Sequence, residues 1–363
     1  MPSKSPVVDI DTPSGKHAAT SLRFHKAPKI WRRSSHISPI NFWKAPSSSE
    51  DHFWSAYEAT RPNYASSNFL ETIYGYHDKK DASFSIAHDV GCGSGVGAFA
   101  LAQRFSHVVA SDNNTSSLHS AQRFLSSKYP PERISFNHCK GEDIASYHEK
   151  NSADLIAAPE SIVLMDSRAA LSSFAKVLKP GGTLAIWMYG RPHFSEVAYK
   201  ERCQDIFDRI ADLSFRKVLR NLNAETEASW KKTASEMASF LDYLDFGKPS
   251  ENWQNVKRMK WNSRSAQLGF FGPGACDFEF EPVSNVRQGE ALFEIEDGEM
   301  WGRNWNISGV REYIDYSFPG IKDLVHGDLK IDELLGELGE AMGGKNASRS
   351  YTWPVALVLA SKA

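Results

Sequence analysis

The sequence predicts an α/β fold with a mostly parallel central sheet, and three features of the chain support that prediction. Short apolar runs alternate with helical patterns between residues 84 and 187, as they do in consecutive βαβ units. A glycine-rich turn at residues 88–97 follows the first of these runs and precedes a helical pattern. A β-rich apolar run at residues 351–360 follows the last helical pattern, at 331–342.

Five strands are predicted before residue 190, from apolar runs bounded by turn residues. They cover residues 84–87, 107–111, 133–139, 154–158 and 183–187. Apolar residues at helical spacing predict helices near 69–77, 98–105, 118–125 and 171–178. Ser111, Thr115 and Ser116 are the expected caps of the helix near 118–125. The Lys-Pro-Gly-Gly turn at 179–182 is expected to end the helix near 171–178.

The glycine-rich turn indicates a ligand site. Glycines let the backbone take positive φ and approach a ligand closely, and the helix that opens there directs N–H groups at it. Asp112 ends the next strand, a position that faces the ribose of a nucleotide-like cofactor in a doubly wound sheet. The dinucleotide pattern G-x-G-x-x-G would need glycine at position 96, which is Val96. The spacing is therefore G-x-G-x-G.

Residues 89–95, Asp-Val-Gly-Cys-Gly-Ser-Gly, resemble the first motif of class I S-adenosylmethionine-dependent methyltransferases. Two further segments resemble motifs of fungal proteins similar to trans-aconitate methyltransferase: Tyr57 with Arg-Pro-x-Tyr at 61–64, and the aromatic stretch 187–194. The resemblance covers residues 53–195. It implies a Rossmann-like fold with a seven-stranded, mostly parallel sheet, an antiparallel last strand and a helical cap insertion. It also implies S-adenosylmethionine as the cofactor.

The same resemblance implies roles for particular residues. Tyr57 and Arg61 would close over the cofactor, with Arg61 meeting its carboxylate. Asp112 would hold the ribose and Asp143 the adenine amino group, whereas Glu142 could as well be solvated. The complete set expected to bind the cofactor is Tyr57, Arg61, Asp89, Gly91, Cys92, Gly93, Gly95, Asp112, Asn113, Glu142, Asp143 and Glu160.

The acceptor side departs from the subgroup. When Glu160 is aligned with the glutamate of the subgroup's Glu-Cys-Ala motif, Val163 and Leu164 occupy the positions of the expected His-Trp pair. His193 is then the nearest alternative base, against the simpler interpretation of a structural hydrogen-bonding histidine. The expected catalytic residues are therefore His193, Glu160 and Arg303, with Arg303 or Arg191 as the cation for an acceptor carboxylate. No cluster has metal-ligand spacing.

Four parts of the chain are expected. Residues 1–50 form a mostly disordered basic arm with eight Lys or Arg against three Asp or Glu, although Trp31, Phe42 and Trp43 are large enough to pack on the domain. Residues 51–194 form the cofactor-binding core. Residues 195–310 form a substrate cap with a helix at 230–244 and the sixth strand near 278–287. Residues 311–363 complete the sheet with a helix and the last strand.

Composition narrows the classes of partner. A net charge of −2 does not favour nucleic acid or an anionic membrane, and no apolar run approaches the length of a membrane span. The four cysteines are widely spaced, which favours reduced thiols. No apolar signal segment is visible near residue 1, so a cytoplasmic protein is expected. A monomer is the favoured oligomeric state.

The predicted function is methyl transfer from S-adenosylmethionine to a small organic acceptor, either an organic acid carboxylate or a hydroxyl of a specialised metabolite. One alternative is a methyltransferase-like protein that binds the cofactor but catalyses another reaction, such as a cyclisation, or only binds. A second is a nicotinamide-dependent oxidoreductase, which the G-x-G-x-G spacing and the closing β-rich run disfavour.

Overall fold

The structure is a computed structural model that describes residues 50–363 except 67, 79–81, 221–223, 249–250 and 264–273. All described residues belong to one compact unit, Ile37–Ala363. The predicted arm, including Trp31, Phe42 and Trp43, therefore lies outside the described residues, apart from Glu50, where the first helix begins.

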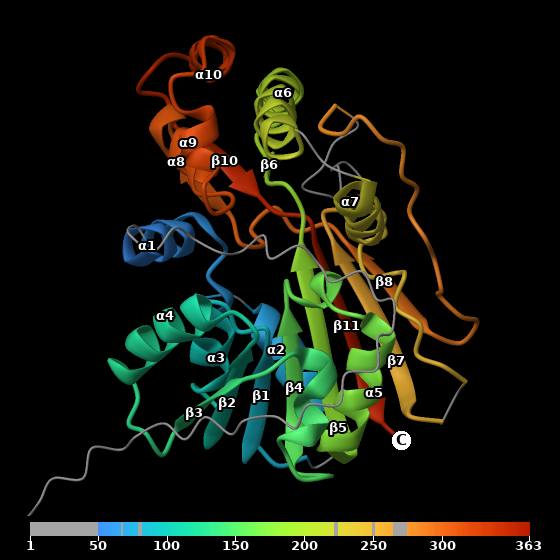
Figure 1. Cartoon of the computed structure of the whole chain (residues 1–363). Coiled ribbons are helices and arrows are strands. Elements are labelled where there is room, and N and C mark those ends of the chain that lie inside the picture. The colour runs from blue at the N-terminus through green and yellow to red at the C-terminus, as the bar shows by residue number, and fades with distance from the viewer. Residues whose placement is uncertain (1–49, 67, 79–81, 221–223, 249–250, 264–273) are drawn as a thin grey trace, which may run out of the picture. The chain divides into compact units, whose positions relative to one another are not determined.

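The described residues form an eight-stranded sheet in the order β3-β2-β1-β4-β5-β11-β7-β8 (Figure 1). Strands β1 to β5 are parallel to one another, whereas β11 runs antiparallel to both β5 and β7. The antiparallel last strand is thus confirmed. The expected seven strands are present from β3 to β7, and β8 extends the sheet by an eighth. The strands are β1 (Ile86–Val90), β2 (His107–Asp112), β3 (Ile134–His138), β4 (Ala153–Pro159), β5 (Leu178–Tyr189), β7 (Trp253–Trp261), β8 (Ala291–Ile295) and β11 (Val355–Lys362).

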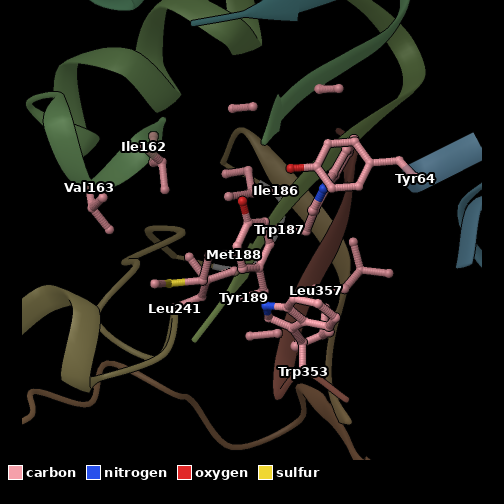
Figure 2. Close-up of a cluster of buried hydrophobic side chains, with 14 of the residues drawn as sticks. Tyr64, Ile162, Val163, Ile186, Trp187, Met188, Tyr189, Leu241, Trp353 and Leu357 are labelled. Carbon is pink, nitrogen blue, oxygen red and sulfur yellow. The ribbon is translucent and has the colours of Figure 1, made fainter. Parts of the chain in front are cut away.

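The centre of the sheet is buried on both faces. Every residue of β4 is buried, as is β11 except for Lys362, which explains why both appear in the sequence as continuous apolar runs. In β8 the three central residues are exposed because it is the edge strand. Figure 2 shows part of the core, in which Trp187 of β5, paired with Leu357 of β11, lies beside Tyr64.

The helices of the first half follow the predicted order. They are α2 (Phe69–Asp78), α3 (Val96–Leu101), α4 (Thr115–Ser126) and α5 (Ser167–Val177). The expected caps of α4 were wrong: Asn114 is the N-cap, and its side chain accepts from the N–H groups of Ser116 and Ser117. Asn114 stands directly before the first helical residue, where its short amide reaches these N–H groups. The first helix, α1 (Glu50–Thr60), ends just before Pro62 and was not predicted.

Residues after 195 differ most from the sequence-based expectation. The predicted strand near 278–287 is irregular, and the sixth strand is β7. Its buried residues are not spaced at period two, and its many polar residues hid it from a search for apolar runs. Helix α7 (Ala224–Ala238) begins and ends earlier than the predicted helix at 230–244. Helix α6 (Lys200–Val218) was not predicted.

A group of helices lies beyond the carboxyl ends of the parallel strands (Figure 1). Helices α6, α8 (Ile307–Asp315), α9 (Ile321–Val325) and α10 (Leu329–Ala341) contact one another, and α1 contacts α8 and α4. A small sheet of β6 (His193–Phe194), β10 (Arg349–Thr352) and β9 (Arg303–Trp305) lies in the same part of the chain. None of the helices in the described residues is long and apolar enough to cross a bilayer.

Gly91, in the glycine-rich turn, and Gly181, outside it, both have positive φ, and together they test how crowded the turn is. Gly91 has φ 71°, and a Cβ atom there would lie 2.8 Å from Ser161 Oγ. Gly181 has φ 76°, and a Cβ atom would have no neighbour within 4 Å. Both Gly→Ala variants carry left-handed strain of about 1–2 kcal/mol. We expect Gly91→Ala to lose roughly 1–3 kcal/mol more from the clash, measured by denaturant unfolding. Equal losses would contradict this.

Candidate active site

A cavity of about 600 Å³ lies where the loops after β1, β2, β3 and β4 meet the end of β5 and helix α1. The carboxyl edge of a parallel sheet is the usual place for a ligand. Of the residues that the sequence predicted to bind cofactor or acceptor, the following line the cavity: Tyr57, Arg61, Gly91, Cys92, Gly93, Asp112, Asn113, Glu142, Glu160 and Arg303. Asp89, Gly95, Asp143 and His193 do not line it.

The glycine-rich turn forms one wall. The N–H groups of Gly91 and Cys92 donate to the Ser111 carbonyl at 2.8 and 2.9 Å, which fixes the turn against the end of β2. Gly93 has φ 54°, and a Cβ atom there would meet nothing within 4 Å, so the open side of this residue faces empty space. Gly95 instead lies buried at the start of α3 against Leu125, and its role is packing.

Asp89 acts from beneath the turn. It is completely buried in β1, and its carboxylate lies against the backbone of Gly97 in the first turn of α3. Burial raises its pKa to about 7, although the Ala98 N–H group favours the charged form. The side chain therefore supports the helix start and does not reach the cavity.

Asp112 holds the other side of the turn. Its Oδ2 accepts from the Gly93 N–H at 2.9 Å, and its Oδ1 accepts from the Asn114 N–H at 2.8 Å. Burial raises the pKa of Asp112, and these N–H groups oppose the rise. The carboxylate is thereby fixed at the end of β2 with its remaining lone pairs available to a ligand.

After β3 the structure brings Glu142, and not Asp143, to the cavity. Asp143 is exposed and does not line it. The Asp166 N–H donates to Glu142 Oε1 at 2.9 Å, which orients this carboxylate. Glu142 and Asp143 both lie in the short 3-10 helix Gly141–Ser146. The tight winding of this helix directs their side chains to different sides. The expected preference for Asp143 therefore finds no support in the geometry.

Arg61 is a buried cation beside the cavity. It is 4% exposed, and its guanidinium carbon lies 4.5 Å from the ring centre of Tyr57 and 4.8 Å from that of Tyr313. Burial would lower its pKa, but the neighbouring tyrosines outweigh burial and raise it, so the group is charged. Nη2 donates to the Ser317 carbonyl at 3.0 Å. The guanidinium is also hydrogen-bonded to the side chains of Tyr57 and Tyr313.

Arg303 connects β9 to the segment that follows α1. Its Nη1 donates to the Ala59 carbonyl and its Nη2 to the Arg61 carbonyl, while the side chain also lines the cavity. Burial lowers its pKa from the ordinary value. Two of its donors are thus committed to the backbone that carries Arg61.

Glu160 stands at the end of β4 in an uncommon backbone conformation, with φ 53°. Its Oε1 accepts from the Tyr189 N–H, and the side chain lines the cavity. Burial raises its pKa to about 8, against the opposing effects of the Tyr189 N–H and of Arg61. A carboxylate with such a pKa is suited to exchange a proton near neutral pH.

The structure does not place His193 at the cavity. It is buried in β6 and pairs with Thr352 of β10, because the chain turns away from the cavity after Tyr189. Burial lowers its pKa. Arg191 is also elsewhere, paired with Asp208 at 2.8 Å and Asp212 at 2.6 Å. A role for His193 as a base would need a rearrangement of this region.

The wall that lacks His-Trp is apolar, as its sequence indicates. Leu164 lines the cavity, and Val163 lies within the buried cluster that Figure 2 shows with Ile162 and Met188. Sequence reasoning missed Glu58 and Tyr189, which also line the cavity. The available signal for Glu58 was its position three residues before Arg61, which directly follows α1, because residues three apart at a helix end lie close together.

Comparison with known proteins shows which family the sequence matches. A family described as "Methyltransferase domain" matches residues 87–182. Methyltransferase pgmE of Aspergillus terreus is 38% identical over 327 residues, covering 88% of this chain and 96% of that protein. Methyltransferase cfoB of Aspergillus candidus is 35% identical over 315 residues, with 85% and 94% covered.

The chain belongs to the class I S-adenosylmethionine-dependent methyltransferases. A solved Haemonchus contortus phosphoethanolamine N-methyltransferase 2, in complex with phosphomonomethylethanolamine and S-adenosylhomocysteine, has 18% identity and a TM-score of 0.39, covering 87% of this chain and 58% of that one. The family assignment therefore rests on the sequence relatives. The cofactor of this family is S-adenosylmethionine, which excludes the alternative of a nicotinamide-dependent oxidoreductase.

The residues present fit this cofactor. Arg61 brings a buried cation to the cavity wall, and a carboxylate is the group that a guanidinium binds best. The open side of Gly93 leaves room that a side chain would fill. The carboxylate of Asp112 stands at the end of β2, the position that binds ribose hydroxyls in doubly wound sheets.

We expect Asp112→Ala to weaken binding of S-adenosylhomocysteine, because it removes charge-assisted hydrogen bonds worth roughly 1.5–3 kcal/mol each. Asp143→Ala is the matched variant, since that side chain is exposed and does not line the cavity. Titration calorimetry should show a loss of at least about 10-fold for Asp112→Ala and little change for Asp143→Ala. A loss of affinity for S-adenosylhomocysteine in Asp143→Ala alone would support the sequence-based expectation that Asp143 binds the adenine amino group.

Proposed function

We propose that this methyltransferase methylates an oxygen of a small organic acceptor, and that the acceptor oxygen is an ionisable hydroxyl deprotonated by Glu160. The observation that carries the proposal is the placement of Glu160 on the cavity wall, with a pKa raised to about 8. A hydroxyl gains nucleophilicity when a base removes its proton as the new bond forms, whereas a carboxylate needs no base.

The composition of the acceptor wall supports a hydroxyl. Leu164 and the apolar cluster behind it offer no polar partner, so an ionised acceptor entering there would lose hydration. Arg303 is the cation expected for a carboxylate, but Nη1 and Nη2 already donate to backbone carbonyls. An acceptor that arrives neutral and loses its proton in place avoids the desolvation cost.

The cofactor supplies an electrophilic methyl group on a positively charged sulfur. The protein then has to align the acceptor oxygen with that methyl group and exclude water, and such positioning accounts for much of the rate in enzymes. Glu160 is well held for this task, because the Tyr189 N–H donates to its Oε1. The second carboxylate oxygen is the one that would take the proton.

A carboxylate acceptor is the second candidate, favoured by the presence of Arg303 on the cavity wall. Membership of the trans-aconitate methyltransferase-like subgroup is part of this candidate, supported by Tyr57 and Arg61 on the wall and opposed by Val163 and Leu164. We also propose that the residues between 195 and 310 act as the acceptor cap and that the protein works in the cytoplasm as a monomer.

The pH dependence of turnover tests the base. Wild-type turnover should rise with pH and level off above about 8, because Glu160 accepts a proton only when ionised. Glu160→Gln should lower turnover about 100-fold or more and remove this rise. The assay uses labelled S-adenosylmethionine with phenols and hydroxylated metabolites as acceptors.

Two variants separate the candidates. His193→Ala should leave the pH profile unchanged, because that side chain does not reach the cavity. A carboxylate acceptor would instead give a flat profile with a large loss for Arg303→Lys and a small one for Glu160→Gln. Tight cofactor binding without methyl transfer to any acceptor would favour a methyltransferase-like protein with other chemistry.

A further inference from the structure

Glu58 is a cavity-lining carboxylate to which neither the sequence motifs nor the proposed mechanism gives a role. It lies on α1, partly buried, three residues before Arg61. Arg61 directly follows Thr60, the last residue of α1, and its N–H group donates to the Glu58 carbonyl at 3.3 Å, so both side chains leave the end of the same turn. The end of α1 therefore presents an anion and a cation to the same cavity.

The carboxylate of Glu58 is held against the glycine-rich turn. Its side chain is hydrogen-bonded to Ser94, which is 4% exposed and also lines the cavity. Burial raises the pKa of Glu58, and this hydrogen bond opposes the rise. A carboxylate has about four acceptor positions, so one hydroxyl partner leaves most of them for a ligand.

The other acids on the cavity wall have backbone partners. N–H groups donate to Asp112, to Glu142 and to Glu160. Glu58 differs because its partner is a side-chain hydroxyl on the turn itself. The Glu58 carboxylate is therefore not held by a backbone N–H group in the way that the carboxylates of Asp112, Glu142 and Glu160 are, which leaves it available to a cationic group of a ligand.

We infer that Glu58 binds the α-ammonium group of S-adenosylmethionine while Arg61 binds its α-carboxylate, so that the end of α1 recognises both charges of the amino-acid tail. The inference rests on the cofactor and is independent of the proposed acceptor. An amino-acid ammonium left without an anion in a partly buried cavity would cost binding energy, and a charged partner removes that cost.

The contact between Glu58 and the α-ammonium group can be tested by measuring two ligands, with and without that group, on matched variants. The ligands are S-adenosylhomocysteine and its analogue in which hydrogen replaces the α-amino group. We expect Glu58→Gln to weaken binding of S-adenosylhomocysteine about 10- to 100-fold and to leave the affinity for the deaminated analogue nearly unchanged. The amide keeps the size of the side chain and can still accept from Ser94. Thermal melts check that the variant is folded.

Two further measurements sharpen the result. Glu142→Gln is the matched control, because it neutralises another cavity carboxylate without changing its length, and it should not discriminate between the two ligands. Arg61→Gln should weaken S-adenosylhomocysteine but spare the analogue that lacks its carboxylate. Calorimetry at one pH and low salt measures all of these affinities.

Equal losses of both ligands in Glu58→Gln would overturn the inference, since they would indicate that Glu58 only fastens α1 to the turn. No loss for either ligand would overturn it too. Neither outcome depends on an acceptor, so the test stays separate from the test of Glu160. A loss confined to the amino-bearing ligand is the result that supports the contact.

Discussion

One wall of the cavity depends on the buried guanidinium of Arg61 and on the residues that hold its segment. Helix α1 packs through a small apolar cluster of its own, in which Phe53, Trp54 and Ala56 meet Tyr316, and this cluster is separate from the main core. Hydrogen bonds from two arginines also hold this segment. Arg61 donates to the Ser317 carbonyl, and Arg303 donates to the carbonyls of Ala59 and Arg61. The charged guanidinium of Arg61, surrounded by aromatic rings and carbonyl groups, thus holds one wall of the site in place.

Much of the cofactor half could be predicted from the sequence because its signals are local. Glycine spacing at 91, 93 and 95 reflects positive φ at each position, and Asp112 follows an apolar run that ends in the turn. Strands β1, β2, β4 and β5 are mostly buried, and burial alone makes them visible as apolar runs. Such signals remain visible in one sequence without knowledge of distant contacts.

The rest depends on contacts between distant residues. Strand β7 is partly exposed and rich in polar residues, so its place beside β11 could not be inferred from periodicity. The choice of Glu142 over Asp143 depends on how a single 3-10 turn directs two adjacent side chains. His193 follows β5 closely in sequence, yet its pairing with Thr352 takes it away from the cavity. No local pattern encodes that pairing.

The position of β11 between β5 and β7 has a consequence for the order of assembly. Strands β7 and β8 reach the parallel strands only through β11, which occurs much later in the chain. Pairing between elements so distant in sequence closes long loops and is slow. The nucleotide-binding strands can therefore pair early, while the flank formed by β7 and β8 waits for β11 to dock on β5. Until β11 docks, the N–H and C=O groups along that edge of β5 have no strand partner, and such an unpaired edge favours aggregation of a newly made chain.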